Sequence, residues 1–109
     1  MSPETADAWY LYMLRCRGGS IYTGITNDLH ARWCAHREGS GARYTRSFPP
    51  EDMLAAWHFA RKGAAARAEM LVKGLPAEDK RRLVAGSLPD GADIIEGGRR
   101  IDTGDLPLV

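Results

Sequence analysis

This chain of 109 residues has only two cysteines, no long apolar run and almost no net charge. Cys16 and Cys34 are too few for a disulfide scaffold, and they are not spaced as a C-x-x-C motif. No apolar stretch approaches the roughly 18 residues of a membrane-spanning helix, so no membrane partner is expected. The N-terminus carries Glu4 and Asp7 and lacks the basic and then apolar pattern of a signal peptide. The sequence therefore predicts one cytoplasmic domain, long enough to bury a core without a structural metal.

The net charge of +1 hides an uneven distribution of charged residues. Residues 8–85 hold thirteen Lys and Arg against seven Asp and Glu, whereas residues 86–109 hold two against five. A basic body is typical of proteins that bind nucleic acid, because lysine and arginine displace the counterions of a phosphate backbone. The acidic segment 87–109 is rich in Gly and Pro, and we expect it to be a poorly ordered tail.

Residues 8–86 are predicted to form a single α+β domain. Aromatic and β-branched residues over 8–25 predict a β-hairpin. The side chains of its first strand are apolar on both faces of the sheet, which indicates a central position in the sheet. A helix is expected next, with Asn27 as its N-cap and Gly39 at its end. The segment 39–46 is read as a glycine-rich basic loop, and 53–59 as a third strand.

Two further helices complete the predicted domain. The first covers 62–75, with an apolar stripe made of Ala64, Ala68, Leu71, Val72 and Leu75. The second has Pro76 at its first position and Gly86 after its last. The fold class is therefore α+β, a three-stranded antiparallel or mixed sheet flanked by helices in the order β-β-α-β-α-α.

Several short motifs along the chain contain polar residues at positions where a hydrophobic core would not require them. They are Tyr10-Leu11-Tyr12, Tyr22-Thr23-Gly24, Arg32 and His36 within 27–36, Gly41-Ala42-Arg43-Tyr44-Thr45, Arg67-Ala68-Glu69 and Val72-Lys73. In this order they resemble the GIY-YIG nuclease superfamily, and more closely its small single-domain bacterial branch. That branch is similar to the nuclease module of structure-selective endonucleases. The resemblance covers roughly 9–86, although the first motif lacks its Gly and Ile and no Asn follows Glu69.

The resemblance implies metal-dependent hydrolysis of phosphodiester bonds in DNA, as in repair or recombination. The catalytic residues would be Tyr12, Tyr22, Arg32, His36 and Glu69. Glu69 would hold one Mg²⁺ or Mn²⁺, since Mg²⁺ often binds through one or two carboxylates. Tyr12 would activate the water, with its pKa lowered by Arg32 and the metal, and Arg32 would stabilise the phosphate. Tyr22 would orient water or phosphate, and His36 would contact a phosphate oxygen or share in proton transfer.

Basic residues near these motifs are candidates for contact with the phosphate backbone. The expected nucleic-acid-binding residues are Gly24, Arg43, Tyr44, Arg46, Lys73, Lys80, Arg81 and Arg82, with Tyr44 able to stack on a base. The run from Lys80 to Arg82 is equally typical of a solvated helix face. Nothing resembles an element that reads base sequence, so selectivity for branched or single-stranded structure is expected. The oligomeric state is left open by the sequence.

The register of the hairpin is a prediction that does not depend on the resemblance. A three-residue loop from Arg17 to Gly19 pairs Tyr12 with Gly24 and places Tyr12 and Tyr22 on one face of the sheet. A two-residue loop places them on opposite faces. We expect the odd-length loop, because such loops often end in a left-handed glycine such as Gly19. Gly24 would then be small so that the substrate backbone can approach.

Three alternative functions use the same residues differently. The first is a nucleic-acid-binding module on the same fold without catalysis. The second is a zinc site built from His30, Cys34, His36 and His58, although no paired-ligand motif exists. The third is a cysteine nucleophile at Cys34 beside His30, which is weaker because Cys16 and Cys34 are typical small buried hydrophobes.

Overall fold

A computed structural model describes residues 8–105 of the chain. The strands are β1 (Trp9–Cys16), β2 (Ile21–Thr26), β3 (Pro50–Phe59) and β4 (Gly98–Ile101). The helices are α2 (Leu29–Arg37), α3 (Arg43–Ser47), α4 (Lys62–Lys73), α5 (Ala77–Ala85), α6 (Gly91–Ile94) and the 3₁₀ turn η1 (Thr103–Asp105). In the described part of the chain, no helix is long and apolar enough to cross a bilayer.

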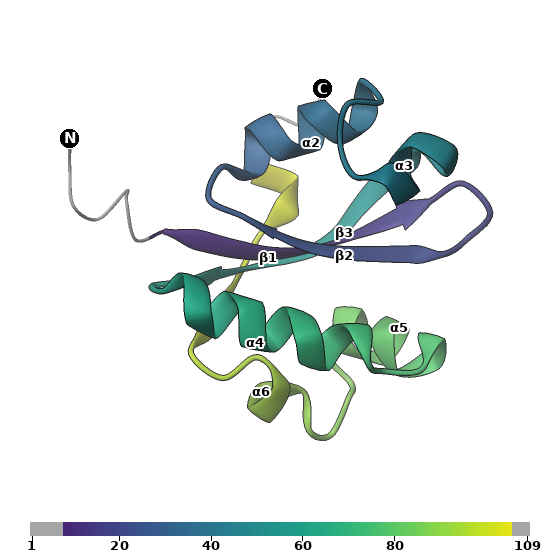
Figure 1. Cartoon of the computed structure of the whole chain (residues 1–109). Coiled ribbons are helices and arrows are strands. Elements are labelled where there is room, and N and C mark those ends of the chain that lie inside the picture. Colours follow the sequence, from purple (N-terminus) through teal and green to yellow (C-terminus); the bar gives the residue numbers. More distant parts are fainter. Residues whose placement is uncertain (1–7, 106–109) are drawn as a thin grey trace.

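The four strands form one antiparallel sheet in the order β2-β1-β3-β4. Helices α2 and α3 lie on one face of this sheet, and α4, α5 and α6 lie on the other (Figure 1). Strand β1 is internal, and its residues 11–14 are fully buried. This agrees with the prediction from its apolar side chains on both faces of the sheet. The sheet therefore separates two layers of helices, and side chains that alternate along β1 enter two different cores.

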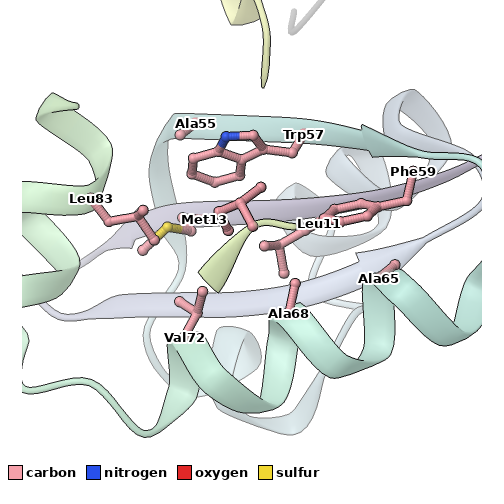
Figure 2. Close-up of a cluster of buried hydrophobic side chains, with 10 residues drawn as sticks. Leu11, Met13, Ala55, Trp57, Phe59, Ala65, Ala68, Val72 and Leu83 are labelled. Atoms are coloured by element: carbon pink, nitrogen blue, oxygen red, sulfur yellow. The ribbon is translucent and has the colours of Figure 1, made fainter. Parts of the chain in front are cut away.

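The larger core lies between the sheet and α4. Leu11 and Met13 of β1 meet Trp57 and Phe59 of β3 and a row of small residues on α4 (Figure 2). That row is Ala65, Ala68 and Val72, which leaves room for the large rings and lets the helix approach the strands. Of the predicted stripe, Ala68 and Val72 are buried and Ala64 and Leu75 pack against this core. The prediction is wrong for Leu71, which is 38% exposed, and for the end of α4, which lies at Lys73.

The structure has one strand more than the three that the sequence predicts. Strand β4 pairs with the end of β3, from Ala56 to Phe59, and it comes from the segment expected to be poorly ordered. Helix α6 lies in the same segment, while residues 106–109 lie outside the described part. Ile95 is buried, and Gly98 lies so close to Phe59 that a Cβ would come within 2.6 Å of the ring. These few apolar and close contacts order a stretch whose composition suggests disorder.

Several predicted boundaries also need correction. The N-cap of α2 is Asp28, whose carboxylate accepts a hydrogen bond from the Ala31 amide, and not Asn27. The expected basic loop contains α3, and β3 begins at Pro50, three residues before the predicted start. Pro76 is the N-cap of α5 and not its first residue, while Gly86 ends that helix in the left-handed conformation, as predicted.

The predicted register of the hairpin is confirmed. Tyr12 pairs with Gly24 and Leu14 with Tyr22, so the loop is the three residues from Arg17 to Gly19. The amide of Cys16 donates to the Ser20 carbonyl and closes this loop. Gly19 has a φ of 89°, a value that an L side chain rarely adopts. Tyr12 and Tyr22 consequently lie on the same face of the sheet, the face covered by α2.

Candidate active site

The two tyrosines of the hairpin form the floor of the candidate site. Their ring centroids are 6.2 Å apart. Tyr12 is buried, whereas Tyr22 on the edge strand β2 is half-buried. The pairing partner Gly24 provides the room, because a Cβ there would lie 2.6 Å from Tyr12 Oη and 2.8 Å from Cζ. The expectation that Gly24 is small to admit a substrate is therefore corrected: the phenol of Tyr12 takes that space.

A chain of hydrogen bonds runs from Tyr12 through His36 to Thr45. Tyr12 Oη lies 2.8 Å from His36 Nε2, and His36 Nδ1 lies 2.6 Å from Thr45 Oγ1. Thr45 in turn donates to the carbonyl of Ala42 at 2.9 Å. His36 is 1% exposed and both of its ring nitrogens are engaged. Of the two roles considered for His36, this geometry favours proton transfer over contact with a phosphate.

Arg32 completes the cluster one turn before His36 on α2. Its guanidinium is half-buried and forms side-chain hydrogen bonds with the phenols of Tyr12 and Tyr22. Burial raises the pKa of Tyr12 to about 12, and the hydrogen bond from Arg32 opposes this only in part. Arg32 thus lowers the pKa of Tyr12, as predicted, but desolvation of the buried phenol outweighs this effect, and the predicted contribution of a bound metal stays a prediction. The phenol of Tyr12 is therefore neutral in the resting protein near pH 7.

Burial also perturbs His36, in the opposite direction. Burial, together with the smaller effect of the positive charge of Arg32, lowers the pKa of His36 from 6.5 to about 4. The imidazole is therefore neutral at pH 7. A neutral phenol donating to a neutral imidazole is the resting arrangement of this pair.

The fifth predicted residue, Glu69, lies on α4, which packs against β1 and β2 from the other face of the sheet. Its carboxylate forms an ion pair with Lys73 at 3.3 Å, and 24% of its side chain is exposed. Lys73 also lines a small hollow of about 190 Å³ together with Thr23, Tyr22 and other residues. Thr23 Oγ1 is buried and has no hydrogen-bond partner in the described part of the chain. Glu69 does not itself line this hollow, and its helix lies across the sheet from α2, which carries Arg32 and His36 (Figure 1).

Three aromatic rings form a ladder that leads from the site to the surface. Tyr22 stacks on Tyr44 with centroids 6.1 Å apart, and Tyr44 stacks on Phe48 at 5.0 Å. The Ser20 hydroxyl forms a hydrogen bond with Tyr44 Oη and fixes the middle ring. Tyr44 is 39% and Phe48 45% exposed, although large apolar rings are usually buried. Phe48 was missed in the sequence, where only its spacing of four from Tyr44 could have indicated it.

The structure places the predicted basic residues at several different sites on the surface. Lys80 and Lys73 line the same hollow as Tyr22 and Tyr44, while Arg43 and Arg46 are exposed on α3. Consecutive residues of a helix point about 100° apart, so the run on α5 does not act as a unit. Arg81 lines a different hollow, and Arg82 pairs with Asp79 at 3.5 Å.

The geometry gives the zinc alternative no support, and for the cysteine alternative it shows only the contact of Cys34 with His30. Cys34 Sγ lies 3.7 Å from His30 Nε2, but among residues 8–105 no three His, Cys, Asp or Glu side chains cluster to hold a metal ion. His36 is buried on another side of α2 and is engaged with Tyr12 and Thr45. Cys16 is fully buried, as expected for a small apolar side chain.

Comparisons with known proteins agree with the fold. A UPF0213 protein of Xanthomonas axonopodis pv. citri is 53% identical over 77 residues, covering 71% of this chain and 76% of that protein. A UPF0213 protein of Cupriavidus necator is 47% identical over 79 residues, covering 72% and 86%. The solution NMR structure of a UPF0213 protein from Bacillus halodurans is 39% identical, with a TM-score of 0.50, and the match covers 79% of this chain and 93% of that one. Residues 8–82 match the GIY-YIG catalytic domain, and the chain belongs to this family of nuclease domains.

Proposed function

We propose that this protein is a metal-dependent endonuclease that hydrolyses phosphodiester bonds in DNA. The observation that carries the proposal is the convergence of Tyr12, Tyr22, Arg32 and His36 on one face of the sheet. A buried phenol between a guanidinium and a neutral imidazole is suited to moving a proton beside a bound anion. Arg32 offers a planar, permanently charged fork to a phosphate.

The proposed reaction begins with a water placed at Tyr12. The phenol oxygen takes a proton from this water while the phenol passes its own proton to His36 Nε2, 2.8 Å away. The water oxygen forms a bond to phosphorus, and the bond from phosphorus to the leaving sugar oxygen breaks. That oxygen takes a proton from solvent. Arg32 stabilises the extra negative charge on the phosphate, and Tyr22 orients the phosphate by hydrogen bonding.

The residues present fit a single Mg²⁺ or Mn²⁺. Glu69 is a partly buried carboxylate paired with Lys73, and Lys73 lines the same hollow as Thr23, whose buried hydroxyl has no partner in the described part of the chain. One carboxylate suffices for Mg²⁺ when waters and phosphate oxygens supply the other ligands. The ion, bound at Glu69, would polarise the phosphate and stabilise the leaving oxygen.

Nucleic acid would bind along the ladder of rings and the lysines beside it. Tyr44 and Phe48 present flat exposed faces, which suit the stacking of unpaired bases. Lys73 and Lys80 lie next to Tyr22 in the hollow and can contact phosphates. Single-stranded or branched DNA is the proposed substrate, because bases in a regular duplex are already stacked. A cytoplasmic location is likewise proposed from the sequence.

The test is a cleavage panel with the full-length protein on single-stranded, duplex, flap and junction DNA, with Mg²⁺ or Mn²⁺ added or omitted. Cleavage should require the metal, and Glu69→Gln should lower it by about 100-fold or more. Glu78→Gln removes an exposed carboxylate on α5 and should leave the rate unchanged. DNA binding without cleavage under every condition would support the alternative, a non-catalytic binding module. Equal cleavage by wild type and Glu69→Gln would reveal a contaminating nuclease.

A further inference from the structure

The direction of each hydrogen bond around His36 can be worked out from Thr45. A threonine hydroxyl has a single proton, and a backbone carbonyl can only accept. Thr45 Oγ1 lies 2.9 Å from the Ala42 carbonyl in donor geometry, so this bond uses its proton. The contact of 2.6 Å between Thr45 Oγ1 and His36 Nδ1 then requires the proton to be on Nδ1. His36 Nε2 is left bare and accepts from the Tyr12 hydroxyl at 2.8 Å.

The loop between α2 and α3 is shaped around this imidazole. Gly41 lies against it so closely that a Cβ would come within 2.5 Å of His36 Nδ1 and 2.9 Å of its Cα. Glycine therefore allows the loop to close over the ring and brings Thr45 to Nδ1. Thr45 is fully buried and lies on α3, so its hydroxyl is shielded from bulk water. The motif from Gly41 to Thr45 thus forms a cap on one edge of the ring.

We propose that Thr45 is a positioning residue that holds His36 as the tautomer protonated on Nδ1, with the bare Nε2 facing the phenol of Tyr12. The effect of this tautomer on catalysis rests on the proposed nuclease function, whereas the assignment of the tautomer itself does not. In the other tautomer Nε2 would carry a proton and could not accept one from Tyr12. An orienting partner on the second ring nitrogen is a common means of fixing a catalytic histidine. In this chain a neutral hydroxyl, and not a carboxylate, occupies that place.

The first test reads the tautomer without any substrate. Correlation of the ring nitrogens with the ring carbon-bound protons by ¹⁵N NMR near neutral pH distinguishes a protonated nitrogen from a bare one, and the His36→Gln spectrum assigns the signals. We expect wild type to be protonated on Nδ1 and bare on Nε2. A wild-type spectrum with the proton on Nε2 would overturn the inference, whatever the nuclease assays show.

Two matched variants connect the tautomer to activity. Thr45→Val keeps the shape of the side chain and removes the hydroxyl, whereas Thr45→Ser keeps the hydroxyl. Thr45→Val should shift the proton of His36 toward Nε2 and lower kcat by about 10- to 100-fold with KM unchanged. Thr45→Ser should retain the wild-type tautomer and most of kcat. A Thr45→Val protein with the wild-type tautomer would contradict the proposal.

The outcomes separate this inference from the proposed function. If every variant shows the expected tautomer and none cleaves DNA, the positioning role of Thr45 stands and the nuclease proposal fails. If wild type cleaves DNA but carries the proton on Nε2, the nuclease proposal stands and the role of Thr45 fails. Should Thr45→Val not fold, as judged by its amide spectrum, the wild-type and Thr45→Ser spectra still decide the question.

Discussion

The free energy of unfolding of this protein should decrease as the pH falls from 7.5 to 5, and His36 should be the residue mainly responsible. The pKa of His36 is lowered from 6.5 to about 4 because the ring is buried and faces Arg32 on its own helix. The other groups that face the ring are Tyr12 of β1, Tyr22 of β2 and Thr45 of α3, and none of them carries a charge that would stabilise an imidazolium. The folded protein therefore resists protonation of His36, while the unfolded chain accepts it at the ordinary pKa.

The sign and size of the effect follow from this difference. Between the two pKa values the unfolded state binds more protons than the folded state, so the free energy of unfolding decreases as the pH falls. A drop from 6.5 to about 4, at about 1.4 kcal/mol per unit, gives a total loss of about 3 kcal/mol once the pH is below both values. About 2 kcal/mol of this is lost between pH 7.5 and 5, which corresponds to a fall of about 10 °C in Tm.

Thermal unfolding followed by circular dichroism across this pH range tests the reasoning. The wild-type Tm should fall steeply below about pH 6.5, and His36→Gln should remove most of that slope, even though its Tm at neutral pH is lower. His30→Gln changes an exposed histidine on the same helix and should keep the wild-type slope. Parallel curves for wild type and His36→Gln would show that the buried imidazole is not the group responsible.

Three further predictions concern packing, binding and the C-terminal strand. Gly24→Ala should destabilise the fold by about 1–3 kcal/mol in urea unfolding, because its Cβ would lie 2.6 Å from the Tyr12 hydroxyl oxygen and 2.8 Å from the ring carbon Cζ. Gly63→Ala on α4 meets nothing within 4 Å and should be neutral or stabilising. Phe48→Ala should weaken the binding of a single-stranded oligonucleotide by about 1–3 kcal/mol in a fluorescence anisotropy titration and leave duplex affinity unchanged. Truncation after Gly86 removes β4 and should abolish the cooperative thermal transition; a truncated protein with the wild-type Tm would contradict the role assigned to β4.

The hairpin shows what local sequence can determine. The loop from Arg17 to Gly19 has a length that sets the pairing, and each residue along the strands then follows by alternation. The shared face of Tyr12 and Tyr22 could therefore be predicted by counting. Helix α5 is similar, since its stop at Gly86 depends on a residue type that favours the left-handed conformation.

Strand β4 and helix α3 show what local sequence could not determine. The four residues of β4 form no pattern of their own, and they are held by pairing with β3 and by the fit of Gly98 against Phe59. Helix α3 has five residues and no side-chain cap, so its stability comes from contacts such as that of Thr45 with His36. Both elements are decided by residues distant in the chain.

In the candidate site, too, the residues themselves could be predicted from the sequence, but properties that depend on packing could not. Residue types and their order indicated Tyr12, Tyr22, Arg32 and His36, and the structure brings these four side chains together. The direction of the Tyr12 pKa could not be predicted, because the depth of burial depends on how α2 packs on the sheet. The role of Thr45 was hidden for the same reason: its partner His36 is nine residues away and meets it only after the loop closes.

The high pKa of Tyr12 does not oppose the proposed reaction. Tyr12 receives one proton and gives up another, so it is neutral before and after the step, and the net acceptor of the proton is His36. Two factors keep His36 neutral in the resting protein: its burial and the positive charge of Arg32. A phosphodiester bound to Arg32 would offset that charge with its own negative charge, and this change favours the imidazolium. The pair is therefore arranged to accept a proton once the substrate is bound, and to remain neutral in its absence.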